Sequence, residues 1–233
     1  MTGTIINFTL IILGSLIGLF FGKKLSDDLK DTLVSTLGLF TAGVGLSMFL
    51  ENENPLFTLV ALVIGGILGE WWNIEGKIAS MGVWLEKRFT GGSAGSSSNF
   101  VRGFLVSSVL FCTGPMAILG AISDGLHGDY LTLAIKSIMD GIISIAFTST
   151  LGIGVLFSAI PVTIYQGSIA LLSNQLQGFI TESMMIEMTA TGGVLLMGIG
   201  VSSLMELRKI RVGNLLPALF LSPLFVYLLS LFK

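Results

Sequence analysis

Two ionisable side chains stand inside an apolar stretch of the chain, where charge is costly. Lys136 and Asp140 are four residues apart within the stretch 131–150, so on a helix they share one face and can pair. A charged side chain at the centre of a bilayer costs roughly 2.5–3.5 kcal/mol on insertion scales, so such groups usually face a partner or a cavity. The pair is a candidate for substrate binding or proton coupling. The alternative is a structural pair near the end of the stretch, with Lys136 snorkelling to the surface.

The run Cys112-Thr113-Gly114-Pro115 interrupts the preceding apolar stretch. A break of this kind frees backbone groups that hydrocarbon cannot satisfy, so it is tolerated only where it is buried in protein or lines a wet cavity. Freed carbonyls and the amides of the following half-helix can bind a cation or an anionic group. A packing kink is the alternative. Asp124, at the far end of the same stretch, joins the candidate site.

Asn7 and Gln166 are polar residues at depth in two other apolar stretches. Taken singly, each is more typical of an interhelical hydrogen bond worth about 0.6 kcal/mol than of a ligand contact. We predict that they complete a substrate site. Its members are Asn7, Cys112, Thr113, Gly114, Pro115, Asp124, Lys136, Asp140 and Gln166. No cofactor or metal is predicted, because a metal site needs several ligands and His127 is the lone histidine; coupling to H⁺ or Na⁺ is a hypothesis.

The composition places these residues in a membrane protein. The chain has 233 residues, of which 52% are hydrophobic and 11% charged, and its mean hydropathy is +0.90. Apolar runs near the 20 residues that a bilayer requires recur along it. We predict an all-α polytopic membrane protein with about eight transmembrane helices, near 3–21, 33–50, 56–72, 100–122, 131–150, 153–172, 192–207 and 215–232. An amphipathic helix over 73–89 and a flexible linker over 90–98 fall between the third and fourth.

The loop charges predict an orientation. With the N-terminus outside, ten of the twelve lysines and arginines fall on the inner side, as the positive-inside rule requires. The acidic residues before the seventh helix, Glu182 and Glu187, then belong to an outer polar stretch. A net charge of −2 argues against nucleic acid as a partner. The expected partners are the lipid bilayer and a small solute or ion.

The two ends of the chain carry the same pattern. Gly38, Gly43, Gly45, Ser47 and Glu51 recur 155 positions later as Gly193, Gly198, Gly200, Ser202 and Glu206. Chance similarity between glycine-rich helices is the alternative, but five identities at one offset favour a true repeat. Because the repeats start an odd number of helices apart, they run in opposite directions, as in many secondary transporters. Within one membrane domain over 1–233, this gives a first repeat over 3–89, the linker 90–98, central helices over 99–150 and a second repeat over 152–233.

Several runs also carry a family resemblance. They are Cys112-Thr113-Gly114-Pro115-Met116-Ala117-Ile118, Asp124-Gly125, Lys136 with Asp140-Gly141, Phe157-Ser158-Ala159-Ile160-Pro161-Val162 and Tyr165-Gln166-Gly167. With these runs the chain resembles the YqgA-like, or YdfK-like, family of bacterial inner-membrane proteins over essentially its whole length. The resemblance implies a multi-pass protein of the bacterial inner membrane and names no substrate.

Together these observations predict a secondary transporter of a small polar or ionic solute that works by alternating access. The alternative is a non-transporting membrane scaffold or regulator, which would have a dry interior. A third class, an intramembrane hydrolase built on Asp124 and Asp140, lacks the Gly-x-Gly-Asp pattern of such proteases, so we expect no enzyme. A homodimer is expected, because the glycine-rich faces of the first repeat need partners.

Overall fold

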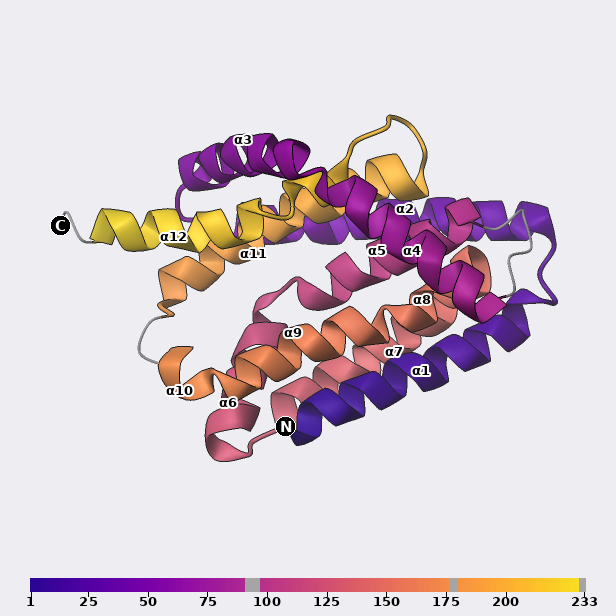
Figure 1. The fold of residues 1–233 in the computed structure, drawn as a ribbon, viewed down its shortest axis with the longest axis horizontal. Helices are drawn as coiled ribbons and strands as arrows, with labels where there is room; N and C mark the ends of the chain where they lie inside the picture. Colours follow the sequence, from indigo (N-terminus) through magenta and orange to yellow (C-terminus); the bar gives the residue numbers. More distant parts are fainter. Residues whose placement is uncertain (91–96, 177–179, 231–233) are drawn as a thin grey trace. The chain divides into compact units, whose positions relative to one another are not determined.

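The computed structural model describes residues 1–90, 97–176 and 180–230, and this part of the chain is helical with no strand (Figure 1). The helices are α1 (Thr2–Gly22), α2 (Asp27–Leu50), α3 (Pro55–Trp72), α4 (Ile74–Thr90), α5 (Ser97–Cys112), α6 (Pro115–His127), α7 (Leu131–Leu151), α8 (Gly154–Phe157), α9 (Ala159–Leu171), α10 (Ser173–Leu176), α11 (Glu182–Ile199) and α12 (Ala218–Ser230). A π-helical turn η1 (Gly200–Leu204) continues α11, and a 3₁₀ turn η2 (Val212–Leu215) precedes α12.

Seven stretches of the described chain are long and apolar enough to cross a membrane. The pair α5 and α6, bent by 62° at Thr113 and Gly114, makes an eighth if it is counted as one span. The predicted all-α polytopic fold is therefore confirmed. The predicted linker 90–98 is too long at both ends, since Thr90 ends α4 and α5 begins at Ser97; residues 91–96 lie outside the described part.

The start of the seventh span was predicted wrongly. The expected range 192–207 omits the first ten residues of α11, which begins at Glu182 behind a Thr181 N-cap. The physical reason is that Glu187, predicted to lie in a polar loop, belongs to α11. Its side chain is buried, and its carboxylate has hydrogen-bond donors. The span then ends at Leu204, through η1.

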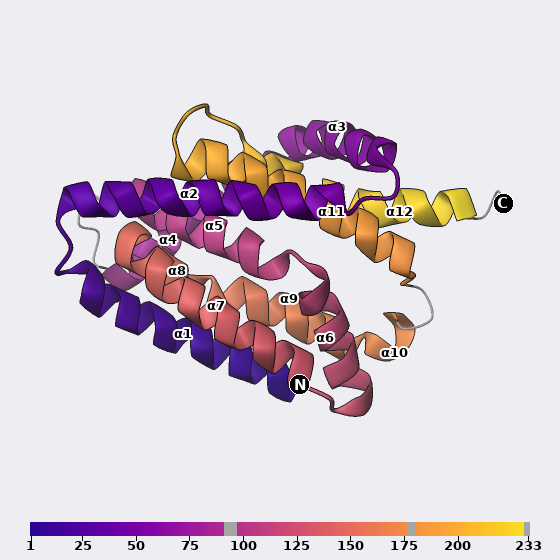
Figure 2. The same cartoon turned by 180° about the vertical axis from the view of Figure 1, so that it is seen from behind.

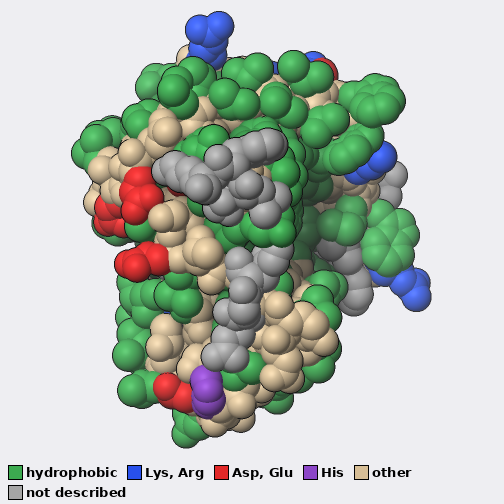
Figure 3. Space-filling model, turned by 90° about the vertical axis from the view of Figure 1, so that its left-hand side faces the viewer, with side chains coloured by type: hydrophobic (Ala, Val, Ile, Leu, Met, Phe, Trp, Pro, Cys, Tyr) green, Lys and Arg blue, Asp and Glu red, His purple; other side chains and the backbone are tan. Residues whose placement is uncertain are grey.

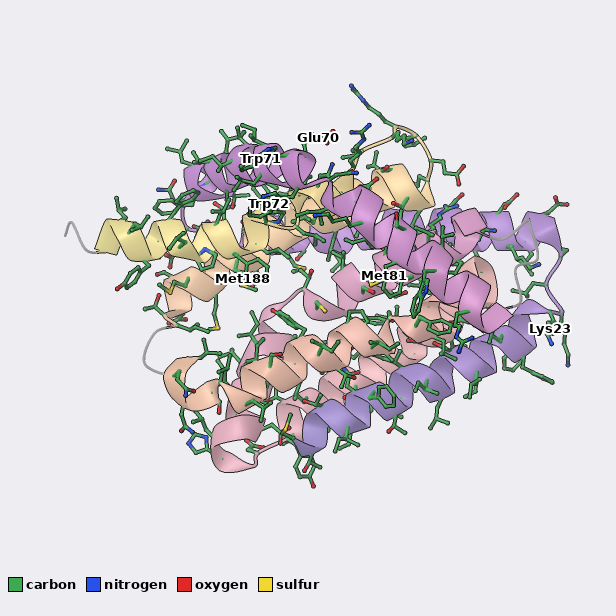
Figure 4. All side chains as sticks on the ribbon, viewed as in Figure 1. Lys23, Glu70, Trp71, Trp72, Met81 and Met188 are labelled. Atoms are coloured by element: carbon green, nitrogen blue, oxygen red, sulfur yellow. The ribbon has the colours of Figure 1, made fainter. Side chains whose placement is uncertain are left out.

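Large apolar side chains cover much of the outside of these helices, as Figure 3 shows for one face. On α1, α3 and α7 they include Ile5, Phe20, Leu56, Ile67, Leu131 and Ile142, all exposed. Trp71 and Trp72 stack on each other at the end of α3 beside Glu70 (Figure 4). Tryptophan at the end of an apolar helix is typical of the membrane interface. These surfaces suit contact with lipid.

The chain divides into two compact units, each described here by itself. Unit 1 comprises Met1–Ser35 and Ser80–Phe179. In it α1 and α7 lie side by side along their length (Figure 1 and Figure 2). A Cβ added at Gly14, Gly18 or Gly22 would collide with the backbone of Gly141, Ile145 or Ser149, respectively. The constant offset of 127 residues shows that the two helices run parallel, and glycine lets their backbones touch.

Unit 2 comprises Thr36–Ala79 and Ile180–Lys233. Here α2 and α11 cross through a second glycine contact. A Cβ at Gly45 would collide with the carbonyl of Gly193, and one at Gly200 with the carbonyl of Gly38. The two helices are therefore antiparallel, because the later residue of α2 meets the earlier residue of α11. Within the same unit α3 packs on α12 and η2.

Two neighbouring glycines of α2 allow a matched test of this packing. A Cβ at Gly43 would meet no described atom within 4 Å, so Gly43→Ala should stabilise the protein by about 0.5–1 kcal/mol through helix propensity. Gly45→Ala should instead destabilise it by about 1–3 kcal/mol, because the contact with Gly193 is overpacked. Unfolding of the two variants in mixed micelles checks this. Equal effects at the two positions would contradict the close crossing.

Candidate functional site

The ion pair predicted from the sequence lies inside unit 1. The Lys136 ammonium contacts Oδ2 of Asp140, and both side chains are less than a tenth exposed. Asn7 of α1 donates through Nδ2 to the same carboxylate oxygen at 3.0 Å. Its Nδ2 also donates to Oε1 of Gln166, on α9, at 3.1 Å. Four predicted site residues from three helices thus form one buried cluster, the Asp140 cluster.

The orientation of the two amides in the Asp140 cluster follows from the charge. A carboxylate only accepts hydrogen bonds, so it fixes Asn7 with its NH₂ toward Asp140. Asn7 in turn fixes Gln166 with its oxygen toward Asn7. Two fully buried atoms then have no hydrogen-bond partner within the described chain, the acceptor Oδ1 of Asn7 and the donor Nε2 of Gln166. An unmet buried polar group costs about 1–3 kcal/mol, so a partner that offers both a donor and an acceptor would be stabilising here.

The end of α5 touches the Asp140 cluster on the side of the helix break. The Lys136 ammonium lies 5.8 Å from the centre of the Phe111 ring, within the range of a cation–π contact. Phe111 packs with Ile11 and Val162, and half-buried Cys112 lies against this group. The broken span therefore contributes apolar and aromatic surface next to the ion pair.

The remaining residues of the break serve the turn itself. Thr113 donates its hydroxyl to the carbonyl of Val109 at 2.6 Å rather than to the ion pair. Gly114 has φ +118°, a conformation that glycine tolerates and other residues rarely adopt. Pro115 begins α6, and because it has no N–H, the carbonyl of Phe111 loses its usual helical partner. Freed backbone therefore exists at the predicted position.

Asp124 lies apart from the Asp140 cluster. Its carboxylate accepts hydrogen bonds from the Gly3 N–H and from the amino group of Met1, each at 3.0 Å. An acidic group at a helix N-terminus is stabilised by the helix dipole. Gly3 and Asn7 are one turn apart on α1, about 6 Å along its axis. In this arrangement Asp124 anchors the first turn of the helix that carries Asn7.

Comparison with known proteins identifies the relatives of the chain. A family model described as "Protein of unknown function (DUF554)" matches residues 2–227. The chain belongs to the DUF554 family. It is 33% identical over 236 residues to "Uncharacterized membrane protein YdfK" of Bacillus subtilis (strain 168), which covers 100% of this chain and 98% of the relative. It is 28% identical over 221 residues to "Uncharacterized protein YqgA" of Escherichia coli (strain K12), covering 94% of each. No solved structure matches.

This DUF554 protein contains a buried carboxylate that the sequence analysis missed. Glu187 is 1% exposed on α11 of unit 2. It accepts hydrogen bonds from the backbone N–H groups of Glu53 at 3.1 Å and Asn54 at 2.7 Å, and from the hydroxyl of Thr58 at 3.4 Å. Glu187 therefore holds the start of α3 against α11. Thr181 gave the missed signal, since an N-cap threonine followed by Glu182 predicts a helix start there.

A second polar group in unit 2 fastens the turn between α3 and α4. Asn214 accepts from the Glu75 N–H at 2.8 Å and donates to Glu70, while Glu75 accepts from the Gly213 N–H at 3.0 Å. Arg211 pairs with Glu70. Burial raises the pKa of the Glu75 carboxyl, although the Gly213 N–H opposes this shift. These reciprocal backbone contacts fix local structure. Among the described residues, no group of His, Cys, Asp and Glu side chains forms a metal site.

The charge balance of the Asp140 cluster can be tested by stability. Lys136→Met leaves a buried carboxylate without its cation, so the free energy of unfolding should fall by about 3–5 kcal/mol. Adding Asp140→Asn removes the second charge and should restore most of this loss. The exposed lysine of α4, in Lys77→Met, should change stability by less than about 0.5 kcal/mol. If Lys136→Met behaves like Lys77→Met, the pair is not desolvated.

Proposed function

We propose that this DUF554 protein is a secondary transporter that moves a small polar or ionic solute across a bacterial inner membrane by alternating access. The observation that carries the proposal is the Asp140 cluster. It places an ion pair and two incompletely bonded amides inside a unit built of membrane-length helices. Charged groups within membrane segments mark substrate and ion pathways more often than they mark simple packing. No catalytic reaction, cofactor or nucleic-acid contact is part of this proposal.

The Asp140 cluster offers a way to couple solute and ion. Within the described chain, the Lys136 ammonium donates its hydrogen bond to Asp140. A proton or Na⁺ that binds the carboxylate weakens its hold on Lys136. The released ammonium is then available to an anionic group of the solute, while Asn7 Oδ1 and Gln166 Nε2 bind its polar part. In this proposal Cys112, Thr113, Gly114 and Pro115 form the wall of the solute site next to the Asp140 cluster, and Asp124 anchors α1.

The proposal of inverted repeats draws support from the contacts inside unit 2. The Gly45 position touches the Gly193 carbonyl and the Met197 N–H, while the Gly200 position touches the Gly38 carbonyl and the Ala42 N–H. Gly193, Met197 and Gly200 are the counterparts of Gly38, Ala42 and Gly45 at the offset of 155. If each residue is replaced by its counterpart in the other repeat, the contact of Gly45 with Gly193 becomes the contact of Gly200 with Gly38. This is the behaviour expected of two copies related by a two-fold axis.

The matched segments also differ in one respect. Residues 45–49 are α-helical within α2, whereas their counterparts Gly200–Leu204 form the π-helical turn η1. π-helical turns are frequent at functional sites. We propose that the two repeats occupy two alternative conformations and exchange them during transport, as inverted-repeat transporters do. The N-terminus outside, and a homodimer, belong to the same proposal.

A scaffold or regulatory role is the alternative. A scaffold has no need for buried polar atoms without partners, because each one destabilises the fold. Asn7 Oδ1 and Gln166 Nε2 therefore favour transport. An intramembrane hydrolase receives no comparable support, since Asp124 bonds to the start of α1 and Asp140 to Lys136.

Transport is tested by currents on solid-supported membranes. Proteoliposomes receive pulses of amino acids, short carboxylates and alkylamines, with empty liposomes as the blank. At least one class should evoke a current in the wild type, and Asp140→Asn should reduce it at least tenfold because the ion pair is lost. Asp129→Asn, at an exposed aspartate, is the control and should leave it unchanged. A panel without current rejects transport of these solutes, and an unaffected Asp140→Asn rejects the role of Asp140.

The inverted arrangement is tested by labelling two equivalent loops. In a Cys112→Ser background, Glu51→Cys and Glu206→Cys carry the only thiols. A membrane-impermeant maleimide added to intact cells should label Glu51→Cys, whereas Glu206→Cys should react only after permeabilisation. Labelling of both loops from the same side would refute the inverted repeat.

A further inference from the structure

Hydroxyl groups in unit 1 fall into two classes. On α7, Ser137, Ser149 and Thr150 donate to backbone carbonyls of the preceding turn, at 2.5–3.1 Å. This is the usual way to satisfy a hydroxyl in a membrane helix. Ser144 and Thr148 on the same helix do not, although they are 0% and 2% exposed; their oxygens have no partner in the described chain.

The same contrast recurs on the neighbouring helices. On α1, exposed Thr9 donates to the Ile5 carbonyl, but buried Ser15 has no partner among the described residues. On α5, Ser108 donates to the Phe104 carbonyl, while the adjacent and fully buried Ser107 is likewise without a described partner. Buried hydroxyls without a described partner thus occur on α1, α5 and α7, and both α1 and α5 pack against α7.

The unbonded hydroxyls of α7 continue the line of the ion pair. Asp140, Ser144 and Thr148 follow one another at intervals of four residues, so they share one face and cover about 12 Å along the axis. Thr148 lies at the contact with Gly18 of α1, one turn beyond Ser15. This face ends near Leu151, where α7 stops.

We infer that this hydroxyl face is a hydrated cation path that connects Asp140 with the C-terminal end of α7. The ligand is a small monovalent cation, either hydronium or Na⁺. Hydroxyl oxygens accept from hydronium and ligate Na⁺, and the Asp140 carboxylate supplies the attraction at the inner end. The inference rests on the proposed function, because it gives the coupling ion its route to the Asp140 cluster. Under the proposed orientation, the route leads to the cytoplasmic side.

Cysteine accessibility tests the path without knowledge of the solute. In a Cys112→Ser background, Ser144→Cys and Thr148→Cys are treated with a small cationic methanethiosulfonate, which reacts with thiolates in water. Both should react at least tenfold faster than two controls on α7. These are Ile142→Cys, which faces lipid, and Ser149→Cys, where the native hydroxyl bonds to backbone. Rates at 144 and 148 no higher than at 142 would show a dry face and overturn the inference.

The charge and identity of the ion are separate arms of this experiment. An anionic methanethiosulfonate should react at least tenfold more slowly than the cationic one at 144, after correction for their rates with a free thiol; equal rates would refute a cation path. Replacing choline by Na⁺ should slow the cationic reaction at least twofold if the ion is Na⁺, and should leave it unchanged if the ion is hydronium.

A second measurement tests the path if the cysteine variants do not fold. Thr148→Val preserves shape and removes the hydroxyl. Its Tm should fall if the hydroxyl binds water and should rise if the site is dry, where an unbonded hydroxyl only destabilises. A hydrated face without solute currents would keep this inference and reject transport of the tested solutes. Solute currents together with a dry face would keep the proposed transporter and overturn the hydrated cation path.

Discussion

The structure of unit 1 depends on one requirement, that a carboxylate buried among membrane helices must be compensated. Asp140 meets it with Lys136 on its own helix and Asn7 on α1. Asn7 reaches Asp140 only because α1 and α7 touch through Gly14 and Gly141, and Gly141 follows Asp140 directly. Gly14 lies seven residues after Asn7, on the same face of α1. A larger side chain at this contact would separate the helices and leave the charge underbonded. Close packing and electrostatics are therefore one constraint here.

Unit 2 meets the same requirement in a different way. The Glu187 carboxylate accepts from two backbone N–H groups at the start of α3, whereas the Asp140 carboxylate relies on side chains. Backbone donors at a helix start cannot turn away without unfolding the helix, but a lysine ammonium can change partner by rotating about its side-chain bonds. Glu187 is thus suited to a permanent fastening and Asp140 to an exchange of partners. This difference separates a structural acid from a candidate functional one.

The sequence predicted those features that depend on local spacing. The apolar runs defined the membrane helices, the interval of four paired Lys136 with Asp140, and Gly114-Pro115 marked the break between α5 and α6. Features that depend on tertiary contacts were less accessible. The sequence pattern groups Asp124 with Asp140, yet the Asp124 carboxylate binds the start of α1, because nothing local shows which helix end an acid will meet. The sequence pattern also predicts a loop at Glu187, because in a membrane protein an unpaired acid usually marks one. Its hydrogen-bond donors come from residues more than 120 positions earlier in the chain.

In the proposed transporter, the two unbonded amide atoms would bear on selectivity as well as affinity. A site with unmet buried hydrogen-bonding groups discriminates strongly against a ligand that lacks the matching group, since those groups stay unpaired in the wrong complex. Asn7 Oδ1 requires a donor and Gln166 Nε2 an acceptor, and both are fixed in orientation by Asp140. A purely apolar solute would leave both unsatisfied, and a bare metal cation would satisfy only Asn7. As the proposed solute site, the Asp140 cluster would therefore favour a solute that carries a donor and an acceptor close together, with its charge balanced by Lys136 or Asp140.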